Sequence, residues 1–202
     1  MTDAPREVRI VAADPAAFGL LGLAIATLVA SSVKLELAQG TLFIVPWALF
    51  FGALAQFVTS IIEYRRNNAF GATAFGAYGM FWFALGLTWL WAFEKNIDIA
   101  AYERCLGFGF LGFLIFNTYM LYGAASINKA LFMVFFFFEL LFLGLLFQIF
   151  MGASGIYAGL AELGVSISSF YASAALVLKA TAGSEVLPLG KPLLELKPLF
   201  GA

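Results

Sequence analysis

The chain has 202 residues, of which 63% are hydrophobic and only 11% are charged, and its formal net charge is -1. Soluble globular domains carry about 25% charged residues, so this composition excludes a water-soluble fold and indicates an integral membrane protein. A near-neutral charge gives no support for nucleic-acid binding. The chain has no histidine and a single cysteine, Cys105, which excludes an intrachain disulfide and the usual histidine-containing zinc sites. We therefore expect neither a metal site nor another cofactor.

Six apolar stretches are long enough to cross a bilayer, whose hydrocarbon core requires about 20 helical residues. They lie at residues 18–36, 43–64, 73–93, 104–124, 131–150 and 158–179. The sixth is the least apolar, because Glu162 and several serines interrupt it. The pattern predicts an all-α integral membrane protein with a six-helix domain at 18–179. An N-terminal segment at 1–17 and a C-terminal tail at 180–202 would flank it.

Basic residues are distributed unequally between the two sides of these spans. One side carries eight of them, at the termini and at the connections from even to odd spans: Arg6, Arg9, Arg65, Arg66, Lys129, Lys179, Lys191 and Lys197. The other side carries Lys34, Lys95 and Arg104. Cytoplasmic loops are enriched in Lys and Arg, so both termini are expected in the cytoplasm. The expected location of the protein is the inner membrane of the cell.

An acidic residue, Glu139, lies in the middle of the fifth stretch, LFMVFFFFELLFLGLLFQIF. A charged side chain inside a bilayer is costly, which makes Glu139 a candidate functional residue. Three roles stay open: a buried, protonated structural acid, a proton-coupling residue, and an interfacial partner of Lys or Arg. A helical residue turns about 100°, so if Phe138 faces a pore, Glu139 points beside it, toward a neighbouring helix. An amide such as Gln56 is a candidate partner there, and Glu139 and Gln56 together form the candidate proton-coupling pair.

The first and third spans begin with candidate anion sites. In DPAAFGLLGLA, starting at Asp14, free N–H groups at the helix start and the helix dipole would favour a carboxylate. The alternative is plain helix initiation, with Asp14 as a cap, Pro15 in the first turn and glycines that allow close packing. In AFGATAFGAYGMFW (69–82) the glycines also indicate packing, whereas the Tyr78 hydroxyl needs a partner or water inside a bilayer.

Isolated amides, Gln56, Asn117 and Gln148, lie within the spans. Their default role in membrane helices is hydrogen bonding between helices, and lining a pathway is the alternative. The stretch GFGFLG (107–112) matches a dinucleotide-binding pattern. Because no strand precedes it and it lies inside an apolar span, we reject that interpretation.

Three stretches carry a resemblance to a known family. Residues 14–23, DPAAFGLLGL, are similar to N-P-x-P-[LF]-G-L-x-G-F, and residues 52–82 are similar to G-x-x-Q…E-[FY]-x-x-G-N-x-F-G-x-T-A-F…Y-G-x-F-W. Residues 185–190, EVLPLG, are similar to a closing V-L-P-[IL]-G. Together they resemble the acetate uptake transporter family, also called succinate–acetate permeases, over nearly the whole chain.

The resemblance implies a homo-hexamer of six-helix protomers, each with its own path for acetate and similar small carboxylates. It also implies a hydrophobic constriction formed by Leu23, Tyr78 and Phe138. At that constriction we expect Tyr78 to donate a hydrogen bond to the substrate carboxylate. The chain departs from the family at Leu176, where an acidic residue is frequent, and at Glu139, where a small polar residue is common.

The two helix starts supply the other candidate site residues. The candidates for substrate binding are Asp14, Phe18, Gly19, Asn68, Phe70, Gly71 and Thr73. Asp14 stands where the family usually has Asn, which places a negative charge at a proposed anion entrance.

The expected function is channel-like transport of acetate and related small carboxylates, succinate among them, with proton coupling left open. The expected partners are the carboxylate, membrane lipid and further copies of the chain. The alternative is a structural or signalling membrane protein that has the same fold and does not transport. An enzyme is not expected, because no metal cluster or nucleophile–base pair is visible in the sequence.

Overall fold

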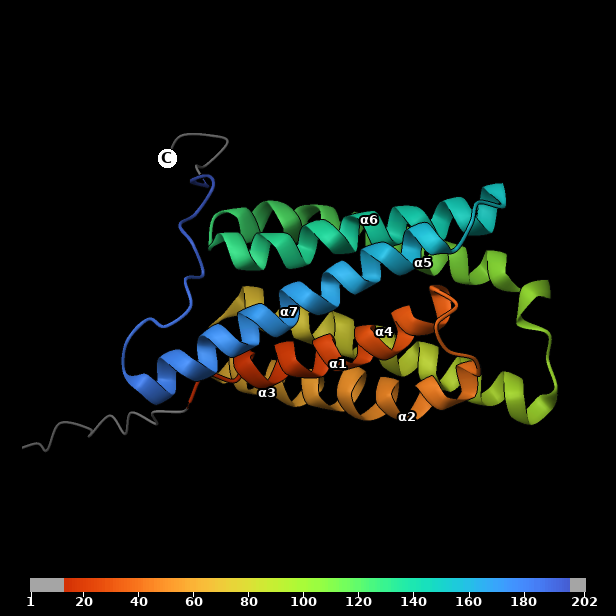
Figure 1. The fold of residues 1–202 in the computed structure, drawn as a ribbon, viewed down its shortest axis with the longest axis horizontal. Helices are drawn as coiled ribbons and strands as arrows, with labels where there is room; N and C mark the ends of the chain where they lie inside the picture. The colour runs from red at the N-terminus through yellow and green to blue at the C-terminus, as the bar shows by residue number, and fades with distance from the viewer. Residues whose placement is uncertain (1–12, 197–202) are drawn as a thin grey trace, which may run out of the picture.

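Long helices make up most of the described chain, which in this computed structural model comprises residues 13–196 (Figure 1). Six helical segments are long and apolar enough to cross a membrane: α1 (Ala16–Lys34), Thr41–Arg65, α4 (Ala69–Lys95), α5 (Glu103–Ala125), α6 (Lys129–Met151) and α7 (Ile156–Ala182). Each predicted span overlaps one of these segments, so the six-helix prediction is confirmed. The largest difference is at α4, which begins at Ala69 instead of residue 73 because Asn68 caps it.

The second span changes its helical winding along its length. It consists of a 3-10 segment η1 (Thr41–Ile44), α2 (Val45–Trp47), a π-helical segment η2 (Ala48–Ala55) and α3 (Gln56–Arg65). Within η2, Gly52 packs against α4, since a Cβ at that position would lie 2.6 Å from Cγ of Trp82. Helices η2 and α4 can therefore approach closely. A further short 3-10 segment, η3 (Ile99–Ala101), precedes α5.

The helices α1, α4 and α6 start in a similar way. Asp14 accepts a hydrogen bond from the Ala16 N–H at 3.1 Å, and Asn68 accepts one from the Gly71 N–H at 3.1 Å. Asn128 accepts one from the Leu131 N–H at 2.8 Å. Backbone N–H groups in a first helical turn lack partners within the helix, and these side chains satisfy one each.

The helices fall into two groups joined by α7. Helices α5 and α6 lie side by side, while α1, the second span and α4 form the other group, and α7 crosses obliquely and contacts both α1 and α6 (Figure 1). The largest of the completely buried side chains are aromatic, among them Trp82, Phe138 and Phe142. The core therefore combines aromatic rings with small and aliphatic residues.

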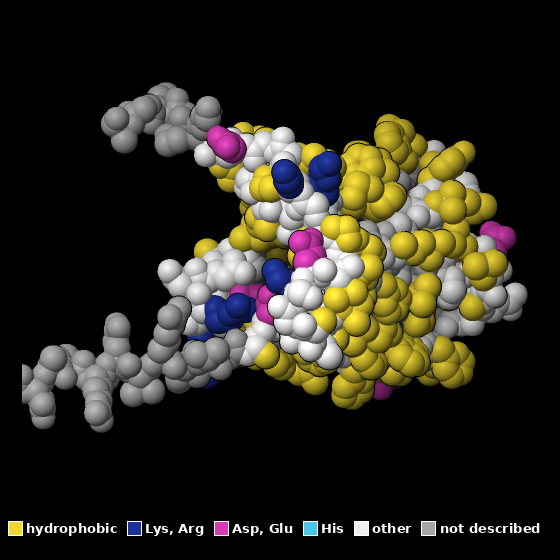
Figure 2. Space-filling view, turned by 60° about the vertical axis from the view of Figure 1, so that its left-hand side comes forward, with side chains coloured by type: hydrophobic (Ala, Val, Ile, Leu, Met, Phe, Trp, Pro, Cys, Tyr) yellow, Lys and Arg dark blue, Asp and Glu magenta, His cyan; other side chains and the backbone are white. Residues whose placement is uncertain are grey.

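Helix α1 starts and α7 finishes at the same end of the bundle (Figure 1). Arg65, Arg66, Lys129, Lys179 and Lys191 belong to helix ends or loops at this end, and Figure 2 shows a basic group there beside a largely hydrophobic outer surface. Arg6, Arg9 and Lys197 lie outside the described residues. The bias of basic residues predicts that this end faces the cytoplasm, and that orientation stays a prediction.

The segment after α7 folds back onto the bundle. The N–H of Ala130 donates to the carbonyl of Leu189 at 2.9 Å, and the N–H of Leu193 donates to the carbonyl of Ala125 at 2.7 Å. The Tyr171 hydroxyl donates to the carbonyl of Pro188 at 2.7 Å. The described part of the 180–202 segment is thus attached to the membrane domain. Most of the 1–17 segment, residues 1–12, lies outside the described residues.

Candidate functional site

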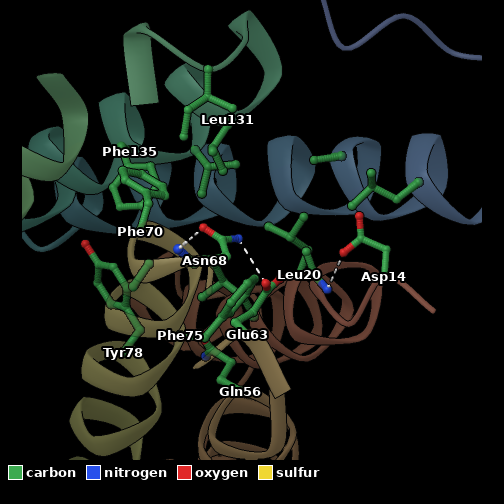
Figure 3. Close-up of a pocket in the computed structure, with 18 of the residues that line it drawn as sticks. Asp14, Leu20, Gln56, Glu63, Asn68, Phe70, Phe75, Tyr78, Leu131 and Phe135 are labelled. Carbon is green, nitrogen blue, oxygen red and sulfur yellow. Dashed lines mark hydrogen bonds between the residues drawn. The ribbon is translucent and has the colours of Figure 1, made fainter. Parts of the chain in front are cut away.

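A cavity of about 420 Å³ extends into the bundle from the end where α1 starts, between α1, α3, α4, α6 and α7 (Figure 3). Its volume is in the range of small-molecule sites, which is about 300–1,000 Å³. Most of its wall is apolar: Ala16, Leu20, Leu23, Phe70, Ala74, Phe75, Ile127, Leu131, Val134, Phe135, Phe138, Ala172, Leu176 and Leu189. The polar and charged lining residues include Asp14, Gln56, Glu63, Arg66, Asn68, Tyr78 and Asn128.

The mouth of the cavity carries a cluster of charged side chains. The Arg66 guanidinium lies 3.0 Å from Oδ1 of Asp14 and 3.8 Å from Oε1 of Glu63. The other oxygen of Glu63 accepts a hydrogen bond from the Asn68 amide at 2.9 Å. Asp14 thus serves both as a helix cap and as an ion-pair partner, so its negative charge is matched by Arg66.

The three residues expected at the constriction all line the inner part of the cavity. Leu23, Tyr78 and Phe138 are 3%, 2% and 1% exposed and all line this cavity within a single chain. The rings of Tyr78 and Phe138 are stacked, with centroids 4.2 Å apart and planes 15° apart. Offset stacking of this kind is favourable for aromatic pairs and holds both rings in place. The structure thus brings the three side chains together; their role as a constriction stays a prediction.

Gln56 lines the same cavity as a completely buried residue. Its Nε2 donates to the carbonyl of Gly52 in the same span at 2.6 Å, and its Oε1 has no hydrogen-bond partner among the described residues. Gln56 therefore does not bond to another helix through its side chain, contrary to the default expectation. It instead has an unused acceptor.

Outside the cavity, a chain of hydrogen bonds continues from Tyr78 through α5 to α6. The Tyr78 hydroxyl donates to Oδ1 of Asn117 at 2.7 Å, and Nδ2 of Asn117 donates to Oε2 of Glu139 at 2.5 Å. The Thr118 hydroxyl lies 2.8 Å from Oε1 of Glu139. Asn117 therefore forms the interhelical hydrogen bonds expected of an isolated amide. Glu139 contacts α5, in the direction predicted by its helical position next to Phe138, and the predicted contact with Gln56 is wrong.

The structure also differs from the expectation that the Tyr78 hydroxyl donates a hydrogen bond to a substrate carboxylate. A phenol has one hydrogen to donate, and here it is directed to Asn117.

The predicted substrate-binding residues divide into two groups. Asp14, Asn68, Phe70 and Gly71 line the cavity, whereas the structure does not place Phe18, Gly19 or Thr73 there. Phe18 and Thr73 are on exposed faces of α1 and α4, and Gly19 is buried against Phe75 and Thr59. The reason is helical rotation: a neighbour of a lining residue in the sequence points about 100° away from it.

Three residues at or next to the site were not singled out in the sequence. Glu63 is only 1% exposed although it lies near the end of the second span. The sequence feature that could have indicated it is its position in the E-[FY]-x-x-G-N part of the block that resembles the family. In the sequence, Arg66 is only one of the basic residues that indicate the orientation of the protein in the membrane. Leu189 lies in the EVLPLG stretch, and that resemblance was its only signal.

A second buried charge lies outside the cavity, between α1 and α7. Nζ of Lys34 is 2.8 Å from Oε2 of Glu162, and the two side chains are 24% and 4% exposed. Lys34 is the last residue of α1, so the pair belongs to the end of the bundle opposite the cavity mouth. The sequence did not predict this contact.

The sequence and the architecture have close parallels among known proteins. Residues 4–189 match the model of the GPR1/FUN34/yaaH family. The chain belongs to this family. The succinate-acetate/proton symporter SatP of Escherichia coli strain K12 is 30% identical over 182 residues, which is 89% of this chain and 96% of the relative.

Other members of the family extend the similarity to a solved structure and to fungi. The solved structure of the bacterial acetate channel SatP superposes with a TM-score of 0.83 at 29% identity, covering 89% of this chain and 100% of that one. Acetate permease A of Emericella nidulans is 32% identical over 143 residues, covering 65% of this chain and 47% of the permease. The family model, the relatives and the six apolar helices together make this chain a multi-pass membrane protein.

Proposed function

We propose that this protein conducts acetate and related small carboxylates across the inner membrane. The pathway lies within each protomer. The observation that carries the proposal is the cavity, which leads from a charged mouth to an inner part lined by Leu23, Tyr78 and Phe138. A small carboxylic acid has one polar and one apolar end. The polar lining and the aromatic rings of the cavity suit these two ends.

The named relatives support the same substrate class, because those proteins are described as an acetate channel, an acetate permease and a succinate-acetate/proton symporter. Succinate is a larger substrate with a second charge, so its passage depends on the width at Phe138. We infer transport without catalysis, since the relatives with these names are transporters and channels.

Uptake of isotope-labelled acetate into proteoliposomes tests the proposal. We expect uptake above that of protein-free liposomes, and we expect unlabelled acetate to reduce it by competition. Replacement of Leu23 by Trp would fill the inner end of the cavity and should block the flux. A native protein that inserts and assembles, yet moves no acetate, would instead support the alternative of a structural or signalling membrane protein.

We also propose that the protomers assemble as a hexamer, as the family resemblance implies. Helix α5 has many exposed apolar side chains, such as Phe108, Ile115 and Tyr122, and a Cβ added at Gly109 or Gly112 would meet no atom within 4 Å. An outer helix face that combines small and aromatic residues suits contact with another helix or with lipid. Native mass spectrometry in mild detergent distinguishes a hexamer from a monomer.

A further inference from the structure

The hydrogen bonds around Asn117 fix the direction in which the Tyr78 hydroxyl points its proton. Asn117 is completely buried, and its Nδ2 donates both to the carbonyl of Phe135 at 2.9 Å and to Oε2 of Glu139 at 2.5 Å. A side-chain amide has two N–H donors, so both are used. The remaining atom, Oδ1, is an acceptor and takes the hydrogen bond from Tyr78 at 2.7 Å.

Glu139 keeps this direction whether or not it carries a proton. Its Oε2 accepts from Asn117, and its Oε1 lies 2.8 Å from the Thr118 hydroxyl, which also lies 2.9 Å from the carbonyl of Leu114. An ionised Glu139 accepts from Thr118. A protonated Glu139 donates from Oε1 to Thr118, while Thr118 donates to Leu114. In both cases Oε2 remains an acceptor, so the Asn117 amide does not turn.

Two residues that line the inner part of the cavity therefore have unused acceptor atoms. Tyr78 has given its only proton to Asn117 and keeps lone pairs on its oxygen. Oε1 of Gln56, in the same cavity, is buried without a partner among the described residues. The titratable group linked to Tyr78 through Asn117 is the Glu139 carboxyl on α6, and α1 contributes the apolar Leu23 to the same cavity.

We propose that Asn117, held by the Phe135 carbonyl and by Glu139, is a positioning residue that takes the proton of the Tyr78 hydroxyl in a hydrogen bond, leaves that oxygen as an acceptor and makes the constriction favour the protonated acid over its anion. The inference rests on the proposed transport function. A carboxylate anion that has lost its water would face only lone pairs at this point, which is unfavourable for a buried charge. The neutral acid has an O–H group that can donate to Tyr78 or Gln56, so it passes with its proton.

The test compares two substrates in proteoliposomes at mildly acidic pH. Trifluoroacetate stays ionised under these conditions, whereas acetate is partly protonated, and protein-free liposomes give the passive flux to be subtracted. The measured quantity is the ratio of trifluoroacetate flux to acetate flux in each variant. Asn117→Leu removes the acceptor and frees the Tyr78 proton for the anion, so we expect this ratio to rise about fivefold, the range of one hydrogen bond.

Further variants separate positioning from a general structural effect. Glu139→Leu leaves the Phe135 carbonyl to hold the Asn117 amide, so it should raise the ratio much less than Asn117→Leu does. Glu139→Gln retains an acceptor oxygen for Asn117 and should keep the native ratio. In a Tyr78→Phe background, Asn117→Leu should no longer change the ratio, because there is no hydroxyl to redirect. The proposal is overturned if Asn117→Leu acts equally without the hydroxyl, or if Asn117→Leu assembles normally and keeps the native ratio. It is also overturned if Glu139→Gln raises the ratio as Asn117→Leu does, because the carboxyl would then act through its own proton.

A spectroscopic readout is independent of transport. The Raman Fermi doublet of tyrosine distinguishes a donating from an accepting hydroxyl, and subtraction of the Tyr78→Phe spectrum isolates Tyr78. We expect a donor signature in the native protein that is lost in Asn117→Leu and kept in Glu139→Gln. An accepting or unbonded Tyr78 in the native protein overturns the inference. Absence of acetate flux together with a donating Tyr78 would overturn the proposed function and, with it, the selectivity, while leaving the hydrogen-bond arrangement intact.

Discussion

The two ends of the bundle hold their ion pairs in different ways. At the cavity mouth, Asp14 and Arg66 form a pair whose side chains are 43% and 38% exposed. At the opposite end, Lys34 pairs with Glu162, whose side chain is only 4% exposed. An exposed pair contributes little free energy, because water and salt screen it. A buried pair is different, since loss of one partner leaves the other as an uncompensated charge.

This difference suggests separate tasks for the two pairs. Lys34 and Glu162 connect α1 to α7, which also exchange hydrogen bonds from Ser166 to the carbonyl of Ala24 and from Ser173 to the carbonyl of Ala17. That contact is part of the frame that holds the cavity walls. Arg66 lies at the mouth, held weakly between Asp14 and Glu63, where an incoming carboxylate can compete for it.

Removal of Lys34 is expected to have the largest effect on stability. Lys34→Met leaves the buried Glu162 without its partner and should lower the free energy of unfolding by about 3–5 kcal/mol. The double variant with Glu162→Leu should recover most of this loss, because neither charge remains. Thermal unfolding in detergent measures both effects. Lys95→Met, an exposed lysine at the same end, is the control and should change stability by less than about 0.5 kcal/mol. Equal losses in the single and double variants would contradict the role of the pair.

The aromatic end of the cavity provides the second prediction. Phe138→Ala removes a buried ring that is stacked on Tyr78 and should cost about 3 kcal/mol of stability. It should also widen the inner end and raise succinate flux relative to acetate flux. Phe142→Ala is the matched control: this ring is equally buried and stacked on Phe138, but it does not line the cavity. A selectivity change of the same size in both variants would mean that loosened packing, and not the width at Phe138, admits succinate.

The sequence predicted the spans well because the thickness of a bilayer imposes a length that composition alone reveals. It also named Leu23, Tyr78 and Phe138, which the structure brings together at one end of the cavity. Neither the spans nor these three residues required knowledge of how the helices pack. The three residues came from the family resemblance, since spacing alone does not connect residues so far apart in the chain.

The rotation of each helix about its axis was the part that the sequence left open. Thr73 lies within a block of similarity, yet it faces outward, two residues from Gly71 in the cavity wall. The partner of Glu139 depended on the same rotation: α6 turns its carboxyl to Asn117 and Thr118 of α5 and away from Gln56. These helices carry apolar residues on all of their faces, so hydrophobic periodicity gives little indication of which face points inward.

Asp14→Asn is expected to have the smallest effect, and it tests whether the mouth pair is exchangeable. The Asn side chain retains an oxygen to accept from the Ala16 N–H, so stability should fall by less than about 1 kcal/mol. The change frees Arg66 from one carboxylate and should raise acetate flux at low ionic strength by about twofold. The gain should decline as added salt screens the mouth, where the screening length is about 8 Å at physiological ionic strength. Asp98→Asn is the control, because Asp98 caps η3 through the Ala100 N–H at the opposite end and its replacement changes the net charge equally. If both variants alter acetate flux alike, the net charge of the protein explains the effect, and Arg66 plays no part in drawing the carboxylate into the cavity.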